Sequence, residues 1–323
     1  MVWIVRNQPL KLVASAVTLV LVTAACGPDK QPTDTSFSVR MLTVRTISGR
    51  WERSAERGLG RIAAELGADV ARVRVEEPAD ERQLLAEQGR AGVHLVFCVG
   101  GSSESALYSV ATEFPKTVFV QLPGRARAAN VAGIRFLPEE VGYLAGAVAG
   151  ALAPDGRLGL LRGGGQPWLE PLEEGYVAGF KSRWRRTRVT VGEGADGVWQ
   201  LSSAGVMVSL YAADSSDPQV LAAAHDAGIQ LVVTDPELID VAAHTVVAAV
   251  DVDVAEAMLR VSREVRDRTF AGREFAFDLG SGVLDVVVNP ELAPDSLAAA
   301  NEALEEARAE ITAGLVEFDG LGL

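Results

Sequence analysis

Residues 130–180 read NVAGIRFLPEEVGYLAGAVAGALAPDGRLGLLRGGGQPWLEPLEEGYVAGF. This stretch starts with a short apolar run and turns at Pro138 into a long helical run. Proline fits the first turn of a helix, where the N–H that it lacks would have no partner. A second apolar run at residues 157–163 and a second helical run at residues 168–184 follow. This order of strand, helix, strand and helix predicts a parallel sheet with helices packed on its faces.

The same alternation continues on both sides of this stretch. Upstream, we expect strands at residues 37–45, 71–77, 93–100 and 117–123, and helices at residues 54–66, 80–88 and 104–113. Downstream, we expect strands at residues 189–194, 205–212, 229–235 and 244–250, and helices at residues 217–228, 252–267 and 295–312. Residues 275–289 are expected to form a β-hairpin across three small residues, Gly280 to Gly282. So many strands exceed one comfortable sheet, and we therefore expect two α/β lobes with a parallel sheet in each.

The long helical run carries a stripe of glycines. Gly142, Gly146 and Gly150 recur every four residues, a spacing that lets a neighbouring backbone approach closely. In a membrane span this pattern would suggest helix dimers, but Glu139 and Glu140 at the start of the run argue against such a span. We expect this helix to pack closely on a sheet.

The N-terminal segment, residues 1–25, resembles a bacterial lipoprotein signal peptide. Arg6 and Lys11 give it a positive start, an apolar run too short to span a bilayer follows, and small residues precede Cys26. Residues 26–36 are polar and read as a flexible tether. We expect lipidation of Cys26, which would anchor the chain by two acyl chains on the outer face of the cell membrane. The alternative is an ordinary signal anchor in which Cys26 has no role.

Composition excludes several classes of function. A net charge of −13 argues against nucleic-acid binding, which needs clustered lysine and arginine. His94, His225 and His244 lack metal-ligand spacing, so we expect no metal site, no cofactor and no enzyme activity. The glycine-rich residues 162–167 lack the Lys-Ser or Lys-Thr of a nucleotide-binding loop. Cys98 lies in a very apolar run and is expected to be a small buried residue.

Candidate binding residues follow from the rule that open parallel sheets bind ligands at the carboxyl ends of their strands. After the first strand, Ser48 and Trp51 lie in a loop that could present an aromatic face to a ligand. The alternative makes Trp51 a lid over the local core. After the third strand, Gly100, Gly101 and Ser102 allow backbone N–H groups to approach a ligand at a helix start. The alternative is a tight turn with a serine as the helix N-cap.

Two acidic residues follow strands of the second half. Asp214 comes after the strand expected at residues 205–212, and Asp235 ends the strand expected at residues 229–235. Either carboxylate could bind ligand hydroxyl groups. Each could instead cap the helix or turn that follows it.

Several blocks in order resemble the basic membrane protein (Bmp) family of ABC-transporter solute-binding lipoproteins, which includes purine-nucleoside binders. The similar blocks are residues 51–59, 93–120, 130–180, 250–259 and the closing helix. The resemblance covers residues 37–318. It implies a type I periplasmic-binding-protein-like fold, with two lobes joined by a hinge and the ligand clamped between them. We expect the first lobe to hold residues 37–136 and about 250–275, and the second to hold residues 137–249 and about 276–323.

The resemblance also implies a function. It predicts an extracytoplasmic solute-binding lipoprotein of an ABC importer, whose partners are a small-molecule solute, the permease and the ATPase. The nucleoside binders carry anchoring residues that this chain replaces with Ser48, Glu52, Leu122, Ala213 and Val250, while Trp51 keeps the stacking surface. We therefore expect a nucleoside or a related small polar molecule as ligand. The alternative is a degenerate family member that acts as a surface interaction or sensing lipoprotein without a transport ligand.

Overall fold

The computed structural model describes residues 36–44, 49–100, 104–164, 168–213 and 216–318. Contacts within the chain group residues 1–35 apart from residues 36–323, and only the second group is described here. The expected signal peptide, the tether and Cys26 therefore lie outside the described residues. No helix in the described part is long and apolar enough to cross a membrane.

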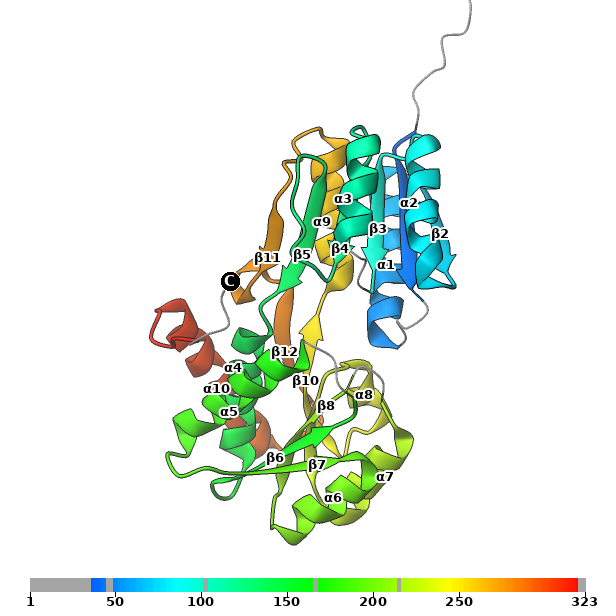
Figure 1. Ribbon diagram of the computed structural model, residues 1–323. Helices are drawn as coiled ribbons and strands as arrows, with labels where there is room; N and C mark the ends of the chain where they lie inside the picture. Colours follow the sequence, from blue (N-terminus) through cyan, green and yellow to red (C-terminus); the bar gives the residue numbers. More distant parts are fainter. Residues whose placement is uncertain (1–35, 45–48, 101–103, 165–167, 214–215, 319–323) are drawn as a thin grey trace, which may run out of the picture. The chain divides into compact units, whose positions relative to one another are not determined.

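The first lobe is built on a six-stranded sheet in the order β11-β5-β4-β3-β1-β2, with all neighbours parallel. Its strands are β1 (Ser38–Val44), β2 (Asp69–Val75), β3 (Leu95–Val99), β4 (Val118–Leu122), β5 (Val131–Phe136) and β11 (Glu274–Phe277). Its helices are α1 (Arg50–Leu66), α2 (Glu81–Arg90), α3 (Glu104–Glu113) and α9 (Val254–Arg266), with a 3-10 turn, η1, at Pro78–Asp80. Helices α2 and α3 cover one face of this sheet, and α1 and α9 cover the other (Figure 1).

Strand β3 is apolar throughout because both of its faces are covered. Leu95, Phe97 and Val99 join the core on the side of α1 and α9, whereas Val96 and Cys98 join the core on the side of α2 and α3. All five are at most 2% exposed. The expectation of a small buried Cys98 is confirmed.

The second lobe is built on another six-stranded sheet, in the order β12-β10-β9-β8-β6-β7. Its strands are β6 (Arg157–Arg162), β7 (Arg188–Glu193), β8 (Val208–Ala212), β9 (Gln230–Val233), β10 (Val246–Val252) and β12 (Leu284–Val288). Its helices are α4 (Pro138–Leu152), α5 (Leu169–Arg183), α6 (Gly194–Ser203), α7 (Pro218–Ala227), α8 (Glu237–Val241) and α10 (Pro294–Thr312). Only β12 pairs antiparallel to its neighbour among these described strands.

The expected hairpin at residues 275–289 is wrong. Strand β11 pairs with β5 of the first sheet, whereas β12 pairs with β10 of the second sheet. The 3-10 turn η2 (Leu279–Ser281) lies between them, and Gly282 adopts a φ of 68°. The reason is burial: Phe275 and Phe277 each lie on the first sheet, and Leu284 lies on the second. The composition of two neighbouring strands predicts a hairpin, but it does not show that each strand pairs in a different sheet.

The glycine stripe of α4 packs on a helix rather than on a sheet, which corrects the expectation. A methyl group at Gly142 would overlap the carbonyl oxygen of Leu172 on α5, and one at Gly146 would overlap that of Tyr176. On α5, a methyl group at Gly175 or Gly179 would likewise overlap backbone atoms of α4. The two helices therefore touch backbone to backbone, as small residues at this spacing allow.

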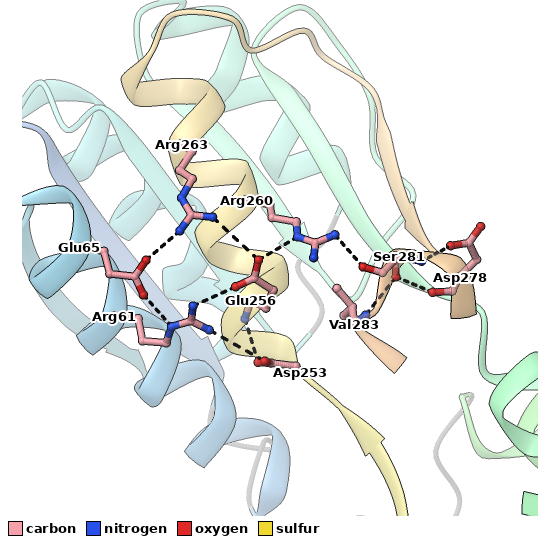
Figure 2. A network of polar contacts seen from close by, with 9 residues as sticks. All are labelled: Arg61, Glu65, Asp253, Glu256, Arg260, Arg263, Asp278, Ser281 and Val283. Atoms are coloured by element: carbon pink, nitrogen blue, oxygen red, sulfur yellow. Dashed lines mark hydrogen bonds and ion pairs between the residues drawn. The ribbon is translucent and has the colours of Figure 1, made fainter. Parts of the chain in front are cut away.

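The chain crosses between the two sheets three times, after β5, after β10 and after β11. We propose to place the boundaries of the lobes at these crossings. A polar network lies beside two of them (Figure 2). Glu256 on α9 accepts from Arg61 of α1 and from Arg260, both at 2.9 Å, and Arg260 also donates to the carbonyl of Ser281 at 2.9 Å. This network ties two helices of the first lobe to the turn η2.

Candidate functional site

A cavity of about 280 Å³ has lining residues from elements of both sheets. The first lobe contributes residues of α1, β5 and the segment after β4, and the second lobe contributes α4, β10 and the start of α5. The lining residues are Trp51, Pro123, Gly124, Arg125, Arg135, Phe136, Pro138, Glu139, Trp168, Pro171 and Val252. Aromatic rings and prolines form most of this wall, with three charged groups among them.

Trp51 is the central aromatic residue of the cavity. It lies in the first turn of α1, which begins at Arg50 and not at residue 54 as expected, because Gly49 (φ 74°) allows the chain to enter the helix there. Its ring centroid lies 5.4 Å from that of Phe136, tilted by 56°, and 5.6 Å from that of Trp168, nearly edge-on at 72°. Such geometries are favourable for aromatic rings. Trp51 is therefore a helix residue and not a loop residue.

The indole Nε1 of Trp51 is a buried donor without a hydrogen-bond partner among the described residues. Trp51 as a whole is only 8% exposed. An unmade hydrogen bond on a buried donor costs about 1–3 kcal/mol. Trp51 lines the cavity, but its Nε1 is shielded from solvent, so a ligand reaches this donor only if neighbouring side chains move.

The three charged groups of the cavity differ in their partners. Arg135 pairs with Glu274 of β11. Glu139 is 7% exposed, and burial raises the pKa of its carboxyl group while nearby Arg135 and Arg125 oppose that rise. Arg125 is exposed and makes no ion pair within the part of the chain that the structure describes. The cavity therefore presents one cation and one buried carboxyl group that can face a ligand.

Next to the cavity, arginines of α1 bind the strand ends of the second lobe. Arg50 is 6% exposed, and its guanidinium donates to the carbonyl of Thr234 and lies 3.6 Å from the carboxylate of Asp251. Burial raises the pKa of Asp251, and Arg50 opposes that rise. Arg53 donates to Asp235 at 2.7 Å. These contacts join the first turn of α1 to the carboxyl ends of β9 and β10.

The residues expected to bind ligand have different outcomes. Trp51 lines the cavity, whereas Asp235 is not among the lining residues. The carboxylate of Asp235 accepts from Arg53 and from the backbone N–H of Glu237 at 3.2 Å, so its described partners are protein groups. Gly100 has a φ of 105°, which requires glycine, and its N–H donates to the carbonyl of Leu122 at 2.9 Å. Ser48, Gly101, Ser102 and Asp214 lie outside the described residues.

Several lining residues escaped the sequence analysis. They are Phe136, Trp168, Arg125 and Glu139. All four lie in or beside residues 130–180, and none was among the strand-end residues that we considered. The signal that could have found Trp168 is its place after the glycine-rich turn of β6. Arg125 and Glu139 carry no sequence signal, because a charged residue in a loop or at a helix start is common and its burial cannot be seen in the sequence.

A second cavity, of about 420 Å³, lies within the second lobe beside α7 and the segment before β10. It is larger than the first, but its lining comes from one lobe only. Its lining includes His225, which contacts the hydroxyl of Thr245 at 3.4 Å. No described group of three His, Cys, Asp or Glu side chains could hold a metal ion, here or elsewhere in the described ranges. We take the smaller cavity as the candidate binding site because both lobes build it.

The fold and this site define a two-lobed solute-binding protein. The family model described as Bmp, ABC transporter substrate-binding protein PnrA-like, matches residues 38–312. The chain therefore belongs to the Bmp family, whose members are substrate-binding proteins of ABC transporters. A comparison with curated protein sequences gives no match.

Solved structures with the same fold come from diverse organisms. A transcriptional activator of the comK gene from Bacillus halodurans is 22% identical with a TM-score of 0.75, over 86% of this chain and 98% of that one. An ABC transporter solute-binding protein from Aeropyrum pernix K1 is 20% identical with a TM-score of 0.69, over 87% and 92%. Another, from Conexibacter woesei, is 19% identical with a TM-score of 0.66, over 87% and 98%. At these identities the likeness shows the fold, and it confirms the expected two-lobed α/β architecture.

Proposed function

We propose that this chain is the extracytoplasmic solute-binding lipoprotein of an ABC importer. One observation carries the proposal: the cavity between the lobes has aromatic walls from both lobes. A ligand held there contacts both lobes at once, so binding favours the arrangement in which the lobes are close together. The permease then receives the solute from this ligand-bound form, and no bond of the solute is changed.

The ligand is a small polar molecule, and a nucleoside is the first candidate that the family resemblance implies. Trp51 and Trp168 offer faces or edges to a planar ring. A thermal-shift screen of the full chain with purine and pyrimidine nucleosides tests this candidate. A nucleoside at about 100 times its Kd should stabilise the chain by about 2.7 kcal/mol. No shift with any nucleoside would exclude this ligand class.

The membrane anchor of the proposed lipoprotein is diacylated Cys26. Its support is the signal-like segment before this cysteine and the polar segment after it. Metabolic labelling with a palmitate analogue should label the full chain and not the Cys26→Ser variant, and it should place the labelled chain in the membrane fraction. Equal labelling of both chains would contradict the anchor.

A second candidate is a sensing or surface interaction lipoprotein without a transport ligand. It is favoured by the residues that replace the nucleoside-anchoring groups, and by a structural neighbour that bears the name of a transcriptional activator. This candidate predicts small-angle scattering curves that do not change when solutes are added. Compaction on addition of a solute would favour the importer instead.

A further inference from the structure

We propose that the solute is a small zwitterion of the α-amino-acid type with an aromatic or apolar body. This inference rests on the proposed function, because it names the ligand class of the same cavity. It follows from the arrangement of charges in the cavity wall, which a neutral solute would leave unused.

Two groups of opposite charge line the cavity without pairing with each other. Arg125 lies after β4 of the first lobe, and Glu139 lies in the first turn of α4 of the second lobe. No ion pair joins these two described side chains, although they are close enough to influence each other electrostatically. The remaining charged group, Arg135, is already paired with Glu274. The wall thus offers one guanidinium and one carboxylate on opposite lobes.

The carboxylate of Glu139 carries a cost that a ligand cation would reduce. Glu139 is 7% exposed, and burying a carboxylate is unfavourable unless a positive charge or hydrogen-bond donors compensate. Its own backbone N–H and the charges of Arg135 and Arg125 compensate in part, but burial has the largest effect on its pKa. An ammonium group of a ligand supplies a further charge and further donors. A neutral solute supplies donors at most, and an anionic solute would add repulsion.

The carboxylate of such a ligand has one accessible partner in the cavity wall, Arg125. The guanidinium of Arg125 can bind a carboxylate through two parallel hydrogen bonds, which are stronger than neutral ones. The indole Nε1 of Trp51 is a buried donor with no described partner, and it reaches a ligand only if the side chains around it move on binding. Arg125 therefore carries the recognition of the carboxylate.

The rest of the wall suits an apolar body. Trp51, Phe136 and Trp168 form an aromatic cluster, and Pro123, Pro138 and Pro171 complete the lining. Aromatic faces also attract an ammonium group. The volume of about 280 Å³ lies at or below the lower end of ordinary ligand pockets, about 300–1,000 Å³, so the solute must be small.

Isothermal titration of the full chain tests this inference with the common L-amino acids, two analogues of phenylalanine, and inosine. Phenethylamine lacks the carboxylate of phenylalanine, and 3-phenylpropionate lacks the ammonium group. We expect at least one apolar or aromatic amino acid, represented by L-phenylalanine, to bind. Each analogue should bind at least about tenfold more weakly, because it loses the charge-assisted hydrogen bonds to one of the two charged groups.

Variants assign the two charges. Arg125→Gln should abolish the preference for phenylalanine over phenethylamine, and Glu139→Gln should abolish its preference over 3-phenylpropionate. Arg127→Gln is the matched control, because Arg127 is exposed and does not line the cavity, and it should leave affinity unchanged. The analogue series on the unaltered chain keeps the test valid even if one variant folds poorly.

The outcomes separate this inference from the proposed function. Binding of inosine without binding of any amino acid would overturn the zwitterion and leave the solute-binding function intact. Equal affinity for phenylalanine and both analogues would also overturn the zwitterion. Failure of every amino acid and of inosine would overturn the zwitterion and count against the importer as well.

Discussion

Glu139 is a carboxyl group that the fold removes almost entirely from water. Burial raises its pKa above the ordinary value of 4.5. The folded chain therefore binds the proton of the Glu139 carboxyl group more tightly than the unfolded chain does. Stability is therefore lost as the pH rises from the ordinary pKa through the raised one.

This linkage predicts a pH-dependent effect of Glu139→Gln. Above the ordinary pKa, the stability of the variant should fall less with pH than that of the original chain. The variant should therefore become more stable relative to the original chain as the pH rises towards neutral. Urea unfolding of both chains between about pH 4.5 and about pH 7 measures the difference. Glu302→Gln, at an exposed position of α10, is the control. A constant difference between Glu139→Gln and the original chain across this range would contradict the assignment.

Tyr176 is a second residue whose burial has a measurable cost. It is fully buried on α5, its hydroxyl has no hydrogen-bond partner among the described residues, and burial raises its pKa. Tyr176→Phe should therefore raise the free energy of unfolding, by about 1 kcal/mol. Denaturant unfolding measures this change.

Tyr143 provides the matched control for that substitution. Its hydroxyl donates to Glu310 at 2.7 Å. Burial, and to a smaller extent this hydrogen bond, raises the pKa of Tyr143 to about 12. Tyr143→Phe removes a bond that exists and should lower stability. If both substitutions destabilise the chain equally, the hydroxyl of Tyr176 has a partner after all.

At the scale of elements, the contact between α4 and α5 depends on glycine. A methyl group at Gly146 would overlap the carbonyl oxygen of Tyr176, so the two helices would have to move apart. Gly146→Ala should therefore lower the free energy of unfolding by about 1–3 kcal/mol, despite the better helix propensity of alanine. Thermal or urea unfolding measures the loss.

Gly60 is the matched control in another helix. It lies within α1, and a methyl group there would have no neighbouring atom within 4 Å. Gly60→Ala should raise the free energy of unfolding, by about 0.5–1 kcal/mol. A stabilising effect at both positions would show that the two helices can separate at little cost.

Most elements could be predicted from the sequence because each shows its own periodicity. Strand β3 is apolar at every position, and α3 and α4 begin where we expected. Helices α6 and α8 were missed, since α6 begins with GADG and α8 has only five residues. The pairing of β11 and β12 was wrong because sheet membership depends on contacts with distant strands, which local composition does not report.

The candidate site was less predictable than the fold. Strand-end reasoning identified Trp51, because an aromatic residue near a helix start in such a loop is conspicuous. It missed Phe136, which lies at the end of β5 before the chain crosses to the second sheet, and Trp168, which directly precedes α5. It also could not foresee that Arg53 would use the carboxylate of Asp235. A protein partner on another element is invisible in a single sequence.

At the scale of the whole molecule, Arg50 joins the two lobes directly. Its buried guanidinium reaches the carbonyl of Thr234 and the carboxylate of Asp251. Arg50→Gln should therefore favour a more open arrangement of the lobes. Small-angle scattering of the ligand-free chain should show a larger radius of gyration than that of the original chain.

The control for this prediction is Arg57→Gln. Arg57 contacts Glu237 at 3.4 Å, but both side chains are 57% exposed, and exposed pairs contribute little. This variant should leave the scattering curve unchanged. Identical curves for all three chains would mean that Arg50 does not determine the separation of the lobes.

The triple crossing has a consequence for how the chain is made. Strand β11 adds to β5 at the border of the first sheet, yet the ribosome synthesises it only after five of the six strands of the second sheet. Until then, β5 is an uncovered sheet border open to pairing with another chain. The first sheet therefore gains its last edge strand only late in synthesis, and we expect a product that ends before β11 to be prone to aggregation.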